Sequence, residues 1–327
     1  MKTKSSYRHI ILATLMVLSN HAFPQIEVNA SPGDSIFQNF LKAKTTFIAR
    51  NTDDTSALRR IFNEQWTLTP FKIVKYDRIV NSVVSDSVNY ISIDYTSQVS
   101  ETHGPASRTI DRSLWVHLDL WRLVGGEKEV IARTKLHLDD ISENSILAIA
   151  QPNRNYFPSD TEPYRFSMKG VKNLYTKAEI HNWSPAFLAL FLQTTEHHLR
   201  QAKKVGSKNE YVSDRLEDLK DGTLLVPTNA LIRTHPIGFY EYGSKNPKKV
   251  FKSYPFKYNV INETELMDSI RNTTEPNFAL YFVRTFGTTH YSIIDLTNGD
   301  IVYAISHKQS VNFGKSDINA IIEKLVE

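Results

Sequence analysis

Cysteine is absent from the 327-residue chain. This absence excludes disulfide scaffolds, CxxC redox motifs, thiolate metal sites, cysteine nucleophiles and a lipid anchor of the bacterial lipoprotein type. The chain also lacks a Gly-rich phosphate loop and the HExxH, GxSxG and EF-hand motifs. The sequence therefore predicts no catalytic, cofactor-binding or metal-binding residues by motif, and no cofactor.

Long apolar runs and a strong net charge are missing as well. No apolar run reaches the roughly 20 residues that a membrane-spanning helix needs, so we expect no transmembrane anchor in the mature chain. The formal net charge is only +4, and Lys2, Lys4 and Arg8 supply three of these charges. A nearly neutral remainder lacks the basic surface that nucleic-acid binding requires, so we expect no nucleic-acid partner.

The N-terminus has the pattern of a secretory signal peptide. Lys2, Lys4 and Arg8 precede the short apolar run of residues 10–18. We expect a signal peptide within residues 1–30, cleaved between positions 22 and 30. Ala22 follows the apolar run closely, whereas Ala30 has the better small-residue spacing, and both sites remain open. The pattern predicts a periplasmic or secreted protein.

A long helix is predicted over residues 184–206, in the middle of the chain. Ser184 can cap it, and Pro185 suits the first helical position because its missing N–H needs no partner there. Residues 186–192 are apolar all round, which predicts burial of this part of the helix. Gly206 can close it in the left-handed conformation.

The remaining patterns predict an α/β (α+β) fold of mixed β-sheets with β-hairpins covered by helices. We expect an N-terminal half over residues 31–150, an aromatic-rich connector over 151–183, and the central helix with a C-terminal half over 184–327. In the N-terminal half we expect helices over 34–48, 53–62, 77–84 and 140–150, strands over 67–75, 89–99, 114–124 and 129–138, and a loop over 101–111. In the C-terminal half we expect helices over 212–220, 263–271 and from 316 onward, and strands over 223–232, 237–242, 254–260, 278–285, 291–296 and 301–306.

The two halves repeat one order of elements, strand, helix, strand, hairpin and helix. Pro70-Phe71-Lys72 opens the first series and Pro255-Phe256-Lys257 the second. The hairpins turn at Gly125-Gly126 and at Asn298-Gly299, dipeptides that tolerate positive φ. We interpret this correspondence as an internal duplication, with convergent α/β patterning as the alternative.

Candidate chemical residues are few. Adjacent residues of a helix face different directions, so His197 and His198 are expected to be surface residues and not metal ligands. His117 and Asp119 share a strand face and are expected to form a sheet-surface contact, whereas His290 and Asp295 lie on opposite strand faces. Six connector aromatics could stack on a ligand, but packing onto the core is favoured: Tyr156, Phe157, Tyr164, Phe166, Tyr175 and Trp183.

Three sequence features resemble an uncharacterised group of bacterial exported proteins. They are Trp183-Ser184-Pro185, Leu224-Leu225-Val226-Pro227 and the two Pro-Phe-Lys strands. The resemblance covers about the C-terminal two thirds of the chain. The resemblance implies no activity. We predict a non-enzymatic binding or assembly protein of the bacterial cell envelope, with an envelope protein, peptide or glycan as ligand. The alternative is a hydrolase that acts on envelope glycan or peptide through carboxylate or histidine residues dispersed in the sequence.

Overall fold

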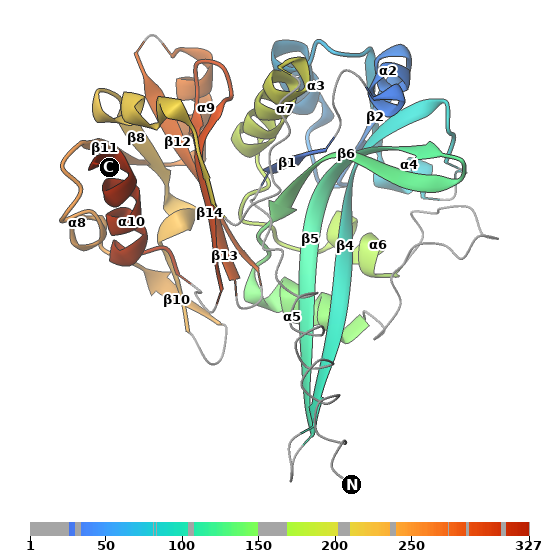
Figure 1. Ribbon diagram of the computed structural model, residues 1–327. Coiled ribbons are helices and arrows are strands. Elements are labelled where there is room, and N and C mark those ends of the chain that lie inside the picture. Colours follow the sequence, from blue (N-terminus) through green and yellow to red (C-terminus); the bar gives the residue numbers. More distant parts are fainter. Residues whose placement is uncertain are drawn as a thin grey trace, which may run out of the picture.

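The computed structural model contains two six-stranded mixed sheets with helices packed against them, which confirms the predicted α/β class (Figure 1). The structure describes residues 26–29, 34–80, 82, 84–103, 108–149, 169–201, 210–235, 240–273, 275–285, 288–308 and 312–326. The predicted signal segment up to residue 25 and connector residues 151–168 lie outside the described residues.

The N-terminal half holds the first sheet, in the order β1-β6-β5-β4-β2-β3. Strand β2 is parallel to β3 and β4, and the other pairs are antiparallel. Its elements are β1 (Ile26–Val28), α2 (Ser35–Lys42), β2 (Lys44–Ala49), α3 (Thr55–Gln65), β3 (Phe71–Lys75), α4 (Tyr76–Ile79), β4 (Val88–His103), β5 (Arg108–Val124), β6 (Glu127–Leu136) and α5 (Asp140–Ile149).

Two sequence predictions in this half were wrong. The helix expected over 34–48 ends at Lys42, and β2 follows it in the interior of the sheet. The β-branched side chains of Thr45, Thr46 and Ile48 favour this strand, which is buried from Thr45 onward. The loop expected over 101–111 is largely strand, because β4 extends to His103 and β5 begins at Arg108.

The C-terminal half holds the second sheet, in the order β11-β8-β12-β13-β14-β7. Helices α6 (Lys169–Thr176) and α7 (Pro185–Arg200) lead into it. Its elements are β7 (Glu210–Val212), the 3-10 helix η1 (Asp214–Lys220), β8 (Thr223–Pro227), the 3-10 helix η2 (Thr228–Leu231), β9 (Ile232–Thr234), β10 (Glu241–Ser244), α8 (Pro247–Val250), β11 (Lys257–Ile261), α9 (Glu263–Arg271), β12 (Asn277–Thr285), β13 (Thr288–Asp295), β14 (Ile301–Lys308) and α10 (Lys315–Val326). Strands β9 and β10 form a separate two-stranded sheet.

The two six-stranded sheets correspond strand for strand. Strand β8 is parallel to β11 and β12, as β2 is to β3 and β4, and the following hairpin and edge strand are antiparallel in both sheets. Each hairpin also has one register shift, at Leu120/Trp121 and at Ile293/Ile294. The predicted duplication of the halves stays a prediction, and this agreement in strand order and direction supports it.

Helix α7 lies between the halves, in contact with α3 on one side and α9 on the other (Figure 1). Ser184 caps it by accepting a hydrogen bond from the Phe187 N–H, and every residue from Ala186 to Leu192 is buried. One continuous apolar core includes these residues, the first sheet and one face of the second sheet. A second core lies on the other face of the second sheet, against α10. The second sheet is therefore covered on both faces, as its apolar hairpin predicts.

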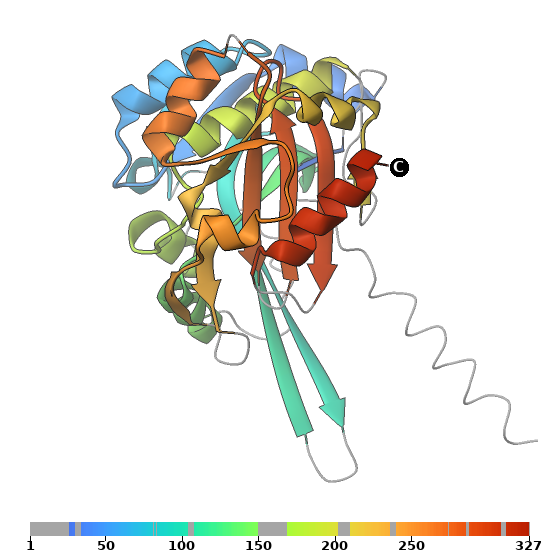
Figure 2. The same ribbon diagram turned by 90° about the vertical axis from the view of Figure 1, so that its left-hand side faces the viewer.

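Strands β4 and β5 continue beyond the first sheet as a two-stranded ribbon, which projects away from the body of the molecule (Figures 1 and 2). Pairing between β4 and β2 ends at Ile91, and pairing between β5 and β6 ends at Val116. From Thr96↔Trp115 to His103↔Arg108, the two strands pair with each other through eight residue pairs. At about 3.4 Å per residue, this ribbon is about 27 Å long.

Candidate functional site: a histidine and glutamate cluster between the halves

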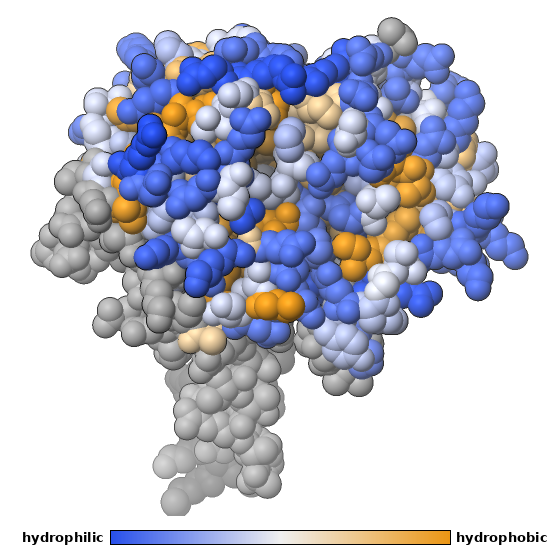
Figure 3. Space-filling view, turned by 180° about the vertical axis from the view of Figure 1, so that it is seen from behind, coloured by the Kyte–Doolittle hydropathy of each residue, from blue (hydrophilic) through white to orange (hydrophobic). Residues whose placement is uncertain are grey.

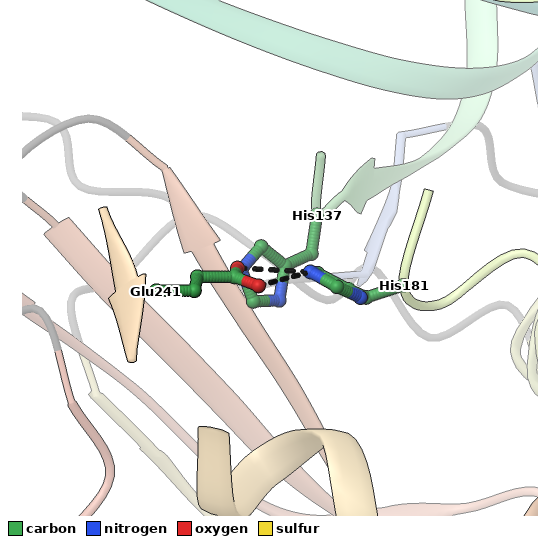
Figure 4. A group of neighbouring side chains, drawn as sticks. All are labelled: His137, His181 and Glu241. Carbon is green, nitrogen blue, oxygen red and sulfur yellow. Dashed lines mark hydrogen bonds and ion pairs between the residues drawn. The ribbon is translucent and has the colours of Figure 1, made fainter. Parts of the chain in front are cut away.

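Three segments that are distant in sequence bring His137, His181 and Glu241 together (Figure 4). His137 directly follows β6 in the N-terminal half. His181 lies between α6 and α7, and Glu241 begins β10 in the C-terminal half. The cluster therefore contains residues from both halves and from the segment that joins them.

Short backbone contacts hold the two histidines beside each other. The His181 N–H donates to the carbonyl of His137 at 2.7 Å, next to an antiparallel bridge between Leu138 and Ile180. The N–H of His137 donates to the side-chain oxygen of Asn182 at 2.7 Å. The Asn182 amide in turn donates to the hydroxyl of Tyr281 on β12, at 3.0 Å. These contacts fix the histidines against the second sheet.

Glu241 faces both imidazole rings. Its carboxylate accepts from Nε2 of His181 at 2.8 and 3.0 Å, and its Oε1 lies 3.9 Å from Nε2 of His137. The ring centroids of the two histidines are 4.8 Å apart, in an edge-to-face arrangement. The side chain of His137 is 2% exposed, whereas those of His181 and Glu241 are 15% and 18% exposed, so solvent reaches the cluster mainly at His181 and Glu241.

Arg284 of β12 supplies the positive charge beside this cluster. Its Nε donates to Nε2 of His137 at 3.3 Å, and its Nη2 donates to Oε1 of Glu241 at 3.4 Å. On its other side, Nη1 of Arg284 lies 3.9 Å from Oε2 of Glu143 on α5. The guanidinium thus lies between two carboxylates, an arrangement that offsets much of the cost of its burial.

Burial changes the protonation of two members of this group. It lowers the pKa of His137 well below the usual histidine value, and the neighbouring His181 and Arg284 lower it further. This imidazole is therefore neutral at pH 7. Burial raises the pKa of Glu143 to about 7, although the Arg284 charge partly opposes the shift. A neutral imidazole is a potential metal ligand, and a carboxyl group that titrates near pH 7 can act as an acid or a base.

His197 and His198 are arranged differently from the sequence prediction. Their rings point to one carboxylate, with Nε2 of each at 3.7 and 3.8 Å from Oδ1 of Asp300 beyond the β13–β14 turn. His198 is fully buried, so it is not a surface residue. The prediction failed because α7 is covered by the second sheet at this point, where the His198 ring accepts from the Ile301 N–H. Arg215 also pairs with Asp300, at 3.6 Å.

The remaining histidine and aspartate residues singled out in the sequence have the following partners. Asp119 is buried and binds Arg133 and Lys128 at 2.7 to 2.9 Å, whereas His117 is also buried and contacts Thr96 at 3.4 Å. The expected location of these two residues on the sheet surface is therefore wrong, although the Asp119 charge acts on the buried His117 ring. His290 bonds Ser306 and Asp295 bonds Thr297 and Arg215, so these two residues have different partners.

The described connector aromatics are packed against the core. Tyr175 is fully buried and stacks on Tyr76 at 4.5 Å, and Trp183 stacks on Phe47 at 6.2 Å. The other four aromatics lie outside the described residues. A cavity of about 100 Å³ lies beside Trp183, and another of about 10 Å³ lies near Tyr281. Both are smaller than the roughly 300–1,000 Å³ typical of small-molecule sites.

The cluster of His137, His181 and Glu241 was not predicted from the sequence. The three residues share no motif and are separated by 44 and 60 positions, so only the fold reveals their proximity. Among the described helices, none is long and apolar enough to cross a membrane. Comparison of the chain with protein-family models, curated proteins and solved structures finds no significant match in any of the three, so the resemblance to exported bacterial proteins stays a prediction.

Proposed function

We propose that the protein is an exported binding or assembly protein of the bacterial cell envelope, and that it binds a protein partner through the β4–β5 ribbon. The projecting ribbon is the observation that carries this proposal. A two-stranded hairpin is marginally stable in water by itself, and each of its outer edges presents backbone N–H and C=O groups. A partner strand added to one edge would satisfy these groups.

The surface of the body gives less support for binding through an apolar patch. In Figure 3, apolar side chains lie in separate groups between hydrophilic ones. Among the described residues, Val124 on β5, Ile141 on α5 and Val326 on α10 are exposed on separate elements, and the one close pair of exposed large side chains is Tyr240 and Tyr242 at β10, with ring centroids 6.2 Å apart. Scattered residues of this kind are normal for a protein surface. Backbone pairing along the ribbon is therefore the better-supported mode of recognition.

Export rests on the N-terminal sequence, and the first sheet restricts where processing would occur. Ile26 and Val28 of β1 are buried, and β1 pairs with β6. Cleavage after Ala30 would remove this edge strand, whereas cleavage after Ala22 would retain it. We infer that the mature chain begins between the end of the apolar run and Ile26.

A shortened ribbon tests the binding proposal. In the variant, residues 98–113 are replaced by Asn-Gly, which joins Ser97 to the buried Leu114 through a turn that favours a hairpin and leaves Leu114 in the core. The body is unchanged, so the variant should melt within about 2 °C of the wild type. Affinity purification from the envelope fraction of the native host should recover a partner with the wild type and lose it with the folded variant. Equal recovery with both proteins would contradict the proposal.

One observation favours the alternative, a hydrolase acting on envelope glycan or peptide. Glu143 titrates near pH 7 and lies beside Arg284, which contacts His137 and Glu241. Incubation of the protein with purified peptidoglycan tests this alternative. Release of reducing ends or free amines by the wild type, lost in the Glu143→Gln variant, would support it. Release at the rate of the buffer alone would reject it.

A further inference from the structure

The cluster of His137, His181 and Glu241 has the donor set of a metal site. One ligand atom of each residue lies within 4.8 Å of those of the other two, and the side chains point toward a common space (Figure 4). Ligand atoms of a tetrahedral zinc site are about 3.3 Å apart, given zinc–nitrogen distances of about 2.05 Å. Side-chain movements of about 1 Å would therefore close the cluster around an ion. We propose that these three residues bind one zinc ion, which links the two halves of the protein.

The chemistry of the ligands selects zinc over the common alkaline-earth cations. Two imidazoles and one carboxylate suit zinc, and a water molecule would take the fourth position. Calcium and magnesium prefer oxygen ligands throughout. For Nε2 of His181 to bind the ion, the neutral ring would have to carry its N–H on Nδ1 instead of donating it from Nε2 to Glu241.

The positions of the ligands explain why the ion would act as a link. His137 and His181 are tied together by a backbone hydrogen bond, whereas Glu241 belongs to the separate β9–β10 sheet. A zinc ion would add a coordination bond between this small sheet and the segment that joins the halves. Binding to the folded state alone raises the melting temperature in proportion to the logarithm of the zinc concentration.

Arg284 opposes the ion and provides a sharp test. Its guanidinium contacts both His137 Nε2 and Glu241 Oε1, so zinc must displace these two contacts. The nearby Glu143 can keep the guanidinium as its partner. Replacement of Arg284 by Gln removes a positive charge within a few ångströms of the ion, and zinc affinity should rise by at least about tenfold.

The experiment uses the untagged mature chain after dialysis against EDTA. Titration calorimetry with zinc chloride should show one equivalent, and zinc should raise the melting temperature by several degrees, whereas magnesium should not. The variants His181→Gln and Glu241→Gln each change a ligand, so each should weaken binding by at least the roughly 10- to 100-fold that loss of an outer-shell partner causes. His235→Gln is the matched control. His235 directly follows β9, the strand paired with the β10 strand of Glu241, but its ring stacks on Tyr240 outside the cluster.

Three results would overturn the proposal. The first is failure of the folded wild type to bind zinc. The second is equal weakening in the His235→Gln control. The third is a zinc ion that still binds to the Glu241→Gln variant but no longer binds to the His197→Gln variant. This result would place the ion at the cluster of His197, His198 and Asp300 instead. Circular dichroism of each variant separates lost binding from lost folding, and the Arg284→Gln variant adds a gain in affinity that misfolding cannot produce.

Discussion

Gly299 and Gly126 form a matched pair that tests how closely the second hairpin is docked on the central helix. Both follow the first residue of a hairpin turn, and both have positive φ, of 80° and 89°. A Cβ atom at Gly299 would lie 2.8 Å from the carbonyl carbon of Gln193 and 2.9 Å from the Thr194 nitrogen, both in the α7 backbone. A Cβ atom at Gly126 would have no heavy atom within 4 Å.

The expected costs follow from this difference. Alanine in the left-handed region costs about 1–2 kcal/mol, and both variants bear this cost. At Gly299 the new methyl group also meets helix backbone that cannot rotate away, and overpacking of this kind adds about 1–3 kcal/mol. We therefore expect Gly299→Ala to lower the free energy of unfolding by about 2–5 kcal/mol and Gly126→Ala by about 1–2 kcal/mol.

Urea denaturation, followed by circular dichroism, measures both variants against the wild type. The midpoint of the Gly299→Ala variant should fall clearly below that of Gly126→Ala, with similar slopes for the two. Equal midpoints would show that the β13–β14 turn does not press against α7 in solution. The close approach of the turn to the helix, and with it the tight joint between the halves, would then be refuted.

Three further predictions concern the core, the titration of one carboxyl group and the N-terminus. Leu190→Asp places an unpaired charge in the core at a fully buried position, and it should cost several kcal/mol and unfold the protein; a melting temperature within 2 °C of the wild type would contradict this. Glu143 has a folded pKa of about 7, above the unfolded value of about 4.3, so the folded state favours the protonated carboxyl group. The contribution of this group to the free energy of unfolding is therefore fully present below about pH 4 and is lost as the pH rises through 7. The wild type should lose up to about 3 kcal/mol more stability than Glu143→Gln between pH 4.5 and 8 in urea titrations, and parallel pH profiles would refute the shift. N-terminal sequencing of the protein from its host should find a start before Ile26, whereas a start at residue 31 would show that β1 is dispensable.

Much of the fold could be predicted from local sequence signals. The helix predicted over 263–271 has the bounds of α9, and in the structure Asn262 and Glu265 form a capping box at its start. The turns at Gly125-Gly126 and Asn298-Gly299 were also predicted correctly, since both glycines of the first turn and Gly299 require positive φ. Strand β3 lies at the edge of its sheet, as Pro70 suggested.

The errors arose where tertiary contacts override local patterns. Strand β2 follows α2 after a single residue, and Phe47 and Ile48 continue the helical spacing of the apolar residues, so no local signal separates the two elements. The residues where β4 ends and β5 begins are mostly polar, and a polar segment of this kind predicts a loop. Their backbone pairing depends on partner residues across the ribbon, and sequence spacing alone does not show that pairing.

The candidate site was beyond sequence reasoning for a related reason. His181 lies in a segment with no regular pattern, and Glu241 lies in a short strand after Pro236. Their proximity to His137 depends on the bridge between Leu138 and Ile180, a contact over 42 positions in the chain. His198 was misjudged because helical periodicity does not show which sheet covers the end of α7.

Site-specific photo-crosslinking in the native host tests the proposed function most directly. A photoreactive amino acid is placed at Gln98 in the ribbon, and in a control protein at Glu217 of η1, whose side chain is 75% exposed. The ribbon position should form a crosslinked product with one envelope protein, and the control position should not. Crosslinks of equal yield at the two positions, or none from the ribbon in cells that export the folded protein, would contradict the proposal.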